Sequence, residues 1–235
     1  MGPTARSSGE QKVFPKQPMP NKIGRPASPR ALDAGGWQPW TKGKKLKKAA
    51  KPAATAAAMA WPKMVHVLLK KENIRQVAVV PDAGHSQLIR LIEADKTMRM
   101  VRLTTEEEGV ALLAGAWLGG DRGVLLMQSS GVGNCINMLS LPLAAHFPLL
   151  MLVTMRGDHG EFNPAQVPMG NNTQRVLEAI DVVVRRADHD HEVVDAVSGA
   201  LRLTFNTFRP AAVLIGQQVM GAKDFRKLSK DDDHE

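Results

Sequence analysis

Three consecutive carboxylates, Glu106, Glu107 and Glu108, stand at the start of a predicted helix and are the first candidates for chemistry. Acidic residues in the first turn of a helix stabilise it through the helix dipole, by roughly 0.3 to 1 kcal/mol each. Successive helical residues point about 100° apart, so the middle glutamate can face inward while its neighbours stay in water. A buried carboxylate needs a partner, and its pKa tends to rise. The run therefore holds either one functional glutamate or three ordinary helix-start charges.

A glycine-rich segment follows, with Ser130, Gly131, Val132, Gly133 and Asn134 between a predicted strand and a predicted helix. Backbone N–H groups and a helix dipole at such a turn favour an anion or the polar edge of a ligand. The segment lacks the third glycine of a dinucleotide fingerprint and the Gly-Lys-Ser/Thr of a phosphate-binding loop. It also lacks the first glycine of the Gly-x-Ser-x-Gly motif of hydrolases. Tight packing of a strand against a helix is the alternative interpretation.

The seven histidines show no metal-ligand spacing, which argues against a metal site on this chain. His85 and His159 fall in predicted loops at the carboxyl edge of the sheet, where open α/β folds bind ligands, and a plain surface position is the alternative for each. Cys135 is the single cysteine, so the chain has no intramolecular disulfide and fits a reducing, cytoplasmic location. We interpret Cys135 as a small buried residue with an unreactive thiol.

Alternating helices and strands position these residues. The sequence predicts helices over 62–72, 86–93, 106–118, 134–145, 173–179 and 191–207, and strands over 74–80, 98–103, 123–127, 149–154, 182–185 and 211–215. A long loop over 155–170 interrupts the alternation, and loops of this length are usually functional or mobile. Strands that are apolar on both faces indicate a parallel sheet with helices on both sides. The fold class is therefore α/β, a single doubly wound domain, and no apolar run is long enough to cross a membrane.

The basic character of the chain comes from its first 60 residues. They hold 12 Lys and Arg against two acids, whereas residues 61–235 carry a net charge of −2. This proline-rich segment is expected to be disordered because it cannot bury enough apolar surface. Its cluster at 42–51 could contact a polyanion or an acidic partner, or could be a solvated extension. Since the remaining body is nearly neutral, composition argues against a nucleic-acid-binding domain.

The combined motifs resemble a known family. The run Thr104 to Trp117, followed by Gln128 to Asn134, is similar to the pyrimidine-binding (PYR) domain of thiamine-diphosphate enzymes. The loop Met155 to Gly170 and the ending Pro210 to Lys223 are similar to the alpha subunits of sulfopyruvate decarboxylases, relatives of phosphonopyruvate decarboxylases. The resemblance covers about 61–227, which leaves the basic tail 1–60 and a charged C-terminal tail at 228–235 outside the PYR-type domain.

The resemblance implies a role for Glu107, which stands two residues before Gly109. In the superfamily, a glutamate at this place hydrogen-bonds N1′ of the aminopyrimidine of thiamine diphosphate and so promotes the cofactor's activation. It also implies that the segment from Ser130 to Asn134 lines the cofactor pocket. An anionic substrate needs cationic or N–H donors, and Arg156, with His85 and His159 as weaker candidates, is our choice for the substrate pocket.

The resemblance further implies a partner. In the family, Mg²⁺ and the cofactor's diphosphate are held by a separate PP domain marked by Gly-Asp-Gly and a later Asn, and this chain lacks that pair. We therefore expect a PP-domain beta subunit in an α2β2 or larger assembly that converts 3-sulfopyruvate to sulfoacetaldehyde and CO2. Two alternatives remain open: another 2-oxo acid such as phosphonopyruvate, handled by a decarboxylase or carboligase, and a catalytically silent scaffold whose basic tail is its working part.

Overall fold

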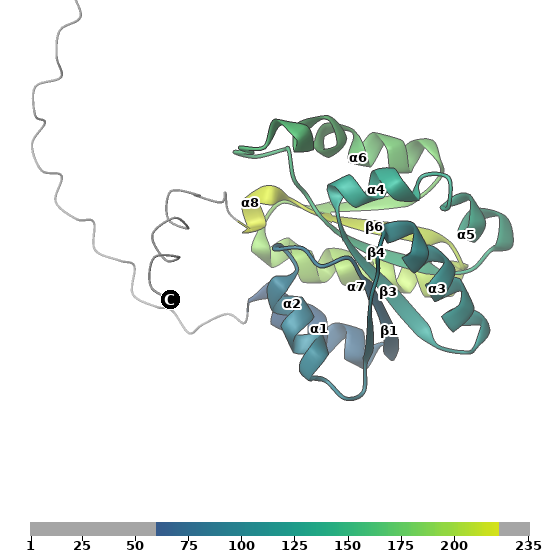
Figure 1. The fold of residues 1–235 in the computed structure, drawn as a ribbon. Helices are drawn as coiled ribbons and strands as arrows, with labels where there is room; N and C mark the ends of the chain where they lie inside the picture. The colour runs from purple at the N-terminus through teal and green to yellow at the C-terminus, as the bar shows by residue number, and fades with distance from the viewer. Residues whose placement is uncertain (1–59, 221–235) are drawn as a thin grey trace, which may run out of the picture. The chain divides into compact units, whose positions relative to one another are not determined.

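The computed structural model describes residues 60–220 and contains one parallel β-sheet (Figure 1). Its six strands lie in the order β2-β1-β3-β4-β6-β5, and every neighbouring pair is parallel. The strands are β1 (Ile74–Val79), β2 (Arg99–Arg102), β3 (Arg122–Gln128), β4 (Leu149–Thr154), β5 (Val183–Ala187) and β6 (Pro210–Ile215). The central strands β4 and β6 are buried along their whole length, as expected for a sheet covered on both faces.

Helices connect the strands and cover both faces of the sheet (Figure 1). They are α1 (Trp61–Lys71), α2 (Ser86–Ala94), α3 (Glu106–Leu118), α4 (Ser129–Cys135), α5 (Ser140–Ala145), α6 (Val167–Ala179), α7 (Asp190–Thr207) and α8 (Gln217–Met220). A short 3-10 helix, η1 (Pro164–Gln166), precedes α6.

The alternation of side chains along each strand divides the core into two halves. Val124 and Leu126 of β3 face one side, where they pack with residues of α1, α2 and α7. Leu125 and Met127 of the same strand face the other side, where they pack with residues of α3, α4 and α6. All four side chains are fully buried. The period of two in a parallel strand thus supplies an apolar face to each layer of helices.

The strand order places a topological switch point at β1. The next strand in the chain, β2, pairs with one side of β1, and the strand after that, β3, pairs with the other side. In open α/β sheets, ligands bind outside the carboxyl ends of the strands at such a point. The segments that follow β1, β2 and β3 are the loop containing Asp82, the start of α3 and the start of α4. The three glutamates at the start of α3 and the glycine-rich segment of α4 therefore lie at this edge.

The structure confirms the predicted α/β class and the six strands, with small changes at their ends. Two helix starts were predicted wrongly. The glycine-rich segment is itself helical, since α4 begins at Ser129 rather than 134, and a separate helix, α5, follows it. The predicted long loop 155–170 is shorter, because α6 begins at Val167, with Pro168 in its first turn where the missing N–H is harmless.

Several predictions concern residues outside 60–220: the basic tail with its cluster at 42–51, the end of the PYR-type domain at 227, and the charged tail at 228–235. They fall outside the described residues and stay predictions. Within 60–220, no helix combines the length and the apolar character that a membrane crossing requires.

Candidate active site

The first of the three glutamates, Glu106, faces inward. Its side chain is only 8% exposed, and its Oε2 accepts a hydrogen bond of 2.8 Å from Asn134 Nδ2 on α4. Gly131 of α4 lies directly against this carboxylate, so that a Cβ added there would be 2.2 Å from Glu106 Oε1. Only glycine allows this approach. Glu106 therefore links the beginning of α3 to α4.

Glu107 is half-buried, and the expectation that it would face inward while its neighbours stay in water was wrong on this point. The helix begins at Glu106 as predicted, but its rotation turns Glu106 rather than Glu107 toward the interior. The hydroxyl of Thr105 donates a hydrogen bond to Glu107 Oε2. This bond, together with the backbone N–H of Glu107, lowers the pKa of the Glu107 carboxyl below its ordinary value. Glu107 is thus ionised and accessible on this chain.

Glu108 is the exposed member of the run, and its Oε2 accepts a hydrogen bond of 2.9 Å from the backbone N–H of Thr104. This is an ordinary helix-start interaction.

Cys135, at the end of α4, is fully buried. Burial, with smaller contributions from the charges of Glu106 and Glu107, raises the pKa of the Cys135 thiol to about 12. The carboxylates of Glu106 and Glu107 therefore lie close enough to α4 to influence Cys135.

The glycine-rich residues divide into two groups. Gly131 and Val132 are buried, and the side chain of Val132 belongs to the core of the α3, α4 and α6 layer. Gly133 and Asn134 are exposed next to the buried Glu106. Ser130 is half-buried, and its hydroxyl donates a 3.0 Å hydrogen bond to Gln128 Oε1. A ligand would meet Gly133, Asn134 and Ser130, whereas the side chain of Val132 is out of its reach.

A cavity of about 70 Å³ lies at the carboxyl edge of the sheet. It forms where β1, β3, β4 and β6 end, and its walls are Asp82, Ala83, Gly84, Gln128, Thr154, Arg156, Phe162, Gln217 and Met220. Gly84 permits the close approach of α8, because a Cβ there would be 2.3 Å from Met220 Sδ and 2.7 Å from Thr154 Cγ2. The cavity occupies the place that the strand order predicts for a ligand.

Asp82 is the acidic wall of this cavity. Its Oδ1 accepts hydrogen bonds from the backbone N–H groups of Gly84 and His85 and from Thr154 Oγ1, at 2.7, 3.0 and 3.0 Å. Its Oδ2 is 2.7 Å from His85 Nδ1. Burial alone would raise the pKa of Asp82, but the charge of His85 and the hydrogen bonds from His85 and Thr154 outweigh burial and lower it. Asp82 is therefore a fixed, ionised group.

His85, a predicted substrate residue, is fully buried rather than on the surface. It pairs with Asp82 and is not among the residues that line the cavity. Its Nε2 is buried and has no hydrogen-bond partner among the described residues. His85 therefore supports Asp82 and does not itself line the cavity.

Arg156, the other predicted substrate residue, does line the cavity, but its charge is already paired. Its Nε and Nη2 each donate a 2.6 Å hydrogen bond to the two carboxylate oxygens of Glu161. The side chain of Glu161 is 3% exposed, and the Arg156 guanidinium holds the pKa of Glu161 far below its ordinary value. The guanidinium carbon of Arg156 lies 5.3 Å from the centre of the Phe162 ring.

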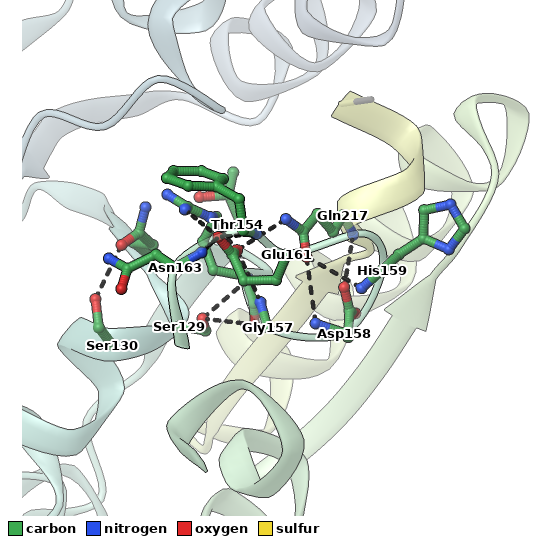
Figure 2. Close-up of polar contacts among 12 residues, drawn as sticks. Ser129, Ser130, Thr154, Gly157, Asp158, His159, Glu161, Asn163 and Gln217 are labelled. Atoms are coloured by element: carbon green, nitrogen blue, oxygen red, sulfur yellow. Dashed lines mark hydrogen bonds and ion pairs between the residues drawn. The ribbon is translucent and has the colours of Figure 1, made fainter. Parts of the chain in front are cut away.

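Glu161 is the centre of the hydrogen-bond network in the segment after β4 (Figure 2). It accepts further hydrogen bonds from the backbone N–H groups of Gly157, Phe162 and Asn163, at 3.0 to 3.1 Å. The amide nitrogen of Gln217 donates to it at 2.9 Å. The carboxylate of Glu161 is thereby saturated, and the segment closes around it.

Gln217 joins this segment to the end of β6. Its Oε1 accepts hydrogen bonds from the backbone N–H groups of Asp158 and His159, at 3.2 and 3.1 Å. The side chain of His159 is exposed and points away from the other labelled side chains in Figure 2. His159 therefore contributes its backbone to the segment and no side chain to the cavity.

Sequence reasoning missed Asp82, Glu161 and Gln217. Asp82 could have been found, since it stands in the turn directly after a predicted strand, where side chains reach the carboxyl edge. Glu161 and Gln217 are 56 residues apart, and no periodic pattern relates them. Within 60–220, no group of three or more His, Cys, Asp or Glu side chains is placed to hold a metal ion.

A six-stranded parallel sheet with a polar cavity at its carboxyl edge defines residues 60–220 as an α/β domain with a candidate ligand site at that edge. The fold is similar to part of the 2-oxoglutarate:ferredoxin oxidoreductase of Magnetococcus marinus, with a TM-score of 0.54 over 72% of this chain and 32% of that chain, at 13% identity.

No family model matches the sequence. The sulfopyruvate decarboxylase subunit alpha of Methanothermobacter thermautotrophicus is 34% identical over 152 residues, which are 64% of this chain and 92% of that protein. The chain belongs to the family of sulfopyruvate decarboxylase alpha subunits.

Two longer relatives match over part of their length. The sulfopyruvate decarboxylase of Methanosarcina acetivorans is 30% identical over 158 residues, which cover 67% of this chain and 40% of that protein. The phosphonopyruvate decarboxylase of Streptomyces viridochromogenes is 38% identical over 112 residues, which cover 47% of this chain and 28% of that protein. In each, more than half of the relative has no counterpart in the match.

Proposed function

We propose that this chain is the alpha subunit of a thiamine-diphosphate-dependent decarboxylase that converts 3-sulfopyruvate to sulfoacetaldehyde and CO2. The observation that carries the proposal is the 34% identity over 92% of a relative named sulfopyruvate decarboxylase subunit alpha. The placement of Glu107, Asn134 and a small cavity beside Arg156 at the carboxyl edge of one sheet supports it. Because the chain's only cysteine is a buried thiol, we place the enzyme in the reducing cytoplasm.

The residues present fit one half of a thiamine diphosphate site. Glu107 offers an accessible carboxylate at the helix start, and Gly133 and Asn134 offer an exposed surface on α4. Glu106 is enclosed by Gly131 and Asn134, so we assign it the task of holding the two helices together rather than touching the cofactor. When bound, thiamine diphosphate supplies the electron sink for loss of CO2. Glu107 would hydrogen-bond the aminopyrimidine of the cofactor in a site closed to water.

Loss of CO2 breaks the bond between the carboxylate and the carbonyl carbon, and that carbon then gains a proton. The cavity beside Asp82 and Arg156 would hold the substrate's anionic tail during this step. Its walls orient the tail through the guanidinium of Arg156 and the amide of Gln128. The aldehyde retains the sulfonate, so the same contacts serve substrate and product.

The other half of the site would come from a beta subunit with a PP domain that holds Mg²⁺ and the diphosphate, in an α2β2 or larger assembly. The short Methanothermobacter relative is named subunit alpha, and the longer Methanosarcina protein carries additional chain beyond the match. Burial of Glu107 by this partner would raise the pKa of its carboxyl from the lowered value on this chain.

Replacing Glu107 by Gln tests the proposal. In the complex with the beta subunit, Glu107→Gln should lower kcat for 3-sulfopyruvate by about 100-fold or more, since a neutral amide cannot make the charge-assisted bond. The melting temperature should change little, because the amide oxygen of a glutamine can still accept the hydrogen bond from Thr105 at this half-buried position. Glu108→Gln, one residue along and exposed, is the matched control and should retain activity. Equal activity of both variants would refute the role of Glu107 and favour a silent scaffold.

Phosphonopyruvate is the second candidate substrate, because a phosphonopyruvate decarboxylase is 38% identical over 112 residues. Its tail has the same shape as a sulfonate but carries more charge. Competition between the two substrates on the reconstituted complex distinguishes them: a higher kcat/KM for phosphonopyruvate would reassign the substrate and leave the decarboxylase class intact.

A further inference from the structure

The charges around the cavity are balanced. Arg156 is the cationic residue among its walls, and Asp82 is the anionic one. Glu161 neutralises the guanidinium through two 2.6 Å bonds, and His85 lies 2.7 Å from Asp82. Asp158, the next acid in the same segment, pairs instead with Arg186 at 2.6 Å. An incoming anion therefore meets guanidinium N–H donors without an excess of positive charge.

The orientation of Arg156 is fixed before any ligand arrives. A guanidinium has five N–H donors, and Glu161 takes two of them, one on Nε and one on Nη2. Phe162 lies against the face of the group. Since Glu161 is itself held by Gly157, Asn163 and Gln217, the pair has little freedom to turn. The remaining N–H groups belong to a residue that lines the cavity.

We propose that the Arg156–Glu161 pair is a charge-balanced subsite that selects a singly charged sulfonate tail over a doubly charged phosphonate tail. Glu161 is its positioning residue. Both tails present three acceptor oxygens, but a phosphonate loses a second proton at slightly alkaline pH and is mostly doubly charged at pH 8, whereas a sulfonate carries one charge. The second charge finds no further cation among the cavity walls, which include the carboxylate of Asp82, and the carboxylate of Glu161 lies behind the guanidinium of Arg156. This inference rests on the proposed function and deepens it.

The test is the ratio of kcat/KM for 3-sulfopyruvate to that for 3-phosphonopyruvate, measured at pH 8 on the complex of the full chain with its beta subunit. Glu161→Gln removes one negative charge beside Arg156 and should lower this ratio by about tenfold or more. A general loss of folding or cofactor would reduce both values together and leave the ratio unchanged. Asp158→Asn removes one charge from the same segment but away from the cavity, and should preserve the wild-type ratio.

A second variant covers the case in which Glu161→Gln disorders the segment. Asp82→Asn removes the other carboxylate at the cavity and should also lower the ratio. An unchanged ratio in both variants, or an equal fall in Asp158→Asn, would overturn the inference.

A binding measurement separates failure of the inference from failure of the proposed function. Methanesulfonate and methylphosphonate are titrated into the full chain, with the Arg156 Nε–H resonance as the reporter. If the complex decarboxylates neither acid, the proposed function fails, yet methanesulfonate should still bind more tightly than methylphosphonate, and Glu161→Gln should reverse the order. Equal or absent binding of the two probes would overturn the inference independently.

Discussion

The three glutamates at the start of α3 have three different environments, and this separates their roles. Glu106 is buried against Gly131 and bonded to Asn134. Glu107 is half-buried and Glu108 exposed, and their carboxylates accept hydrogen bonds from the segment just before the helix. A buried carboxylate with a fixed partner positions its surroundings, whereas an accessible one can meet a ligand. The contrast supports Glu107 as the proposed cofactor contact and Glu106 as the link between helices.

Cys135 provides a test of the electrostatics at this link. Burial and the charges of Glu106 and Glu107 raise its pKa from 9.0 to about 12. A pKa raised in the folded state gives stability that is present below pH 9 and is lost as pH rises toward 12. The free energy of unfolding should therefore fall over this interval, and Cys135→Ala should reduce the slope. Urea unfolding at several pH values measures the free energy of unfolding. An equal pH dependence in the wild type and in Cys135→Ala would contradict the raised pKa of Cys135.

At the scale of elements, the contact between α3 and α4 depends on a missing Cβ. Gly131 leaves room for the Glu106 carboxylate, whereas a Cβ added at Gly133, two residues later on the same helix, would meet only the Met169 side chain within 4 Å. The two glycines differ in what surrounds them, although both lie in one seven-residue helix. They form a matched pair for substitution.

Gly131→Ala should be destabilising, by about 1 to 3 kcal/mol, because the new Cβ would displace the Glu106 carboxylate from Asn134. Gly133→Ala should be neutral or stabilising by up to about 1 kcal/mol, because alanine favours the helix and the Met169 side chain can adjust at 3.4 Å. Denaturant unfolding of the two variants checks this. If the Gly131→Ala protein is as stable as the Gly133→Ala protein, the contact between Gly131 and Glu106 tolerates an added Cβ, which would contradict this account.

The elements were predictable where local pattern decides them, and the site only in part. The strands are continuous apolar runs such as Leu149–Thr154, so their existence followed from the sequence. The start of α4 did not, since its two glycines disfavour a helix that tertiary packing nonetheless forms. Which glutamate faces inward depends on helix rotation, where one residue is about 100°. The pairing of Arg156 with Glu161 depends on the path of an irregular segment that no periodicity describes.

At the scale of the whole molecule, residues 60–220 provide the accessible carboxylate of Glu107 and a small cavity lined by Arg156, but the described residues include no cluster that could hold a metal ion. The matched relatives are a short protein named subunit alpha and longer proteins that match over less than half of their length. This pattern supports an enzyme whose second half, in the proposed assembly, is a separate chain.

The most direct test of this account is the release of CO2 from 3-sulfopyruvate by this chain alone, by its beta subunit alone, and by the two together, each with thiamine diphosphate and Mg²⁺. We predict CO2 and sulfoacetaldehyde only from the mixture, and none from the mixture when thiamine diphosphate is omitted. Equal turnover by this chain alone, or no turnover by the complete mixture, would contradict the account.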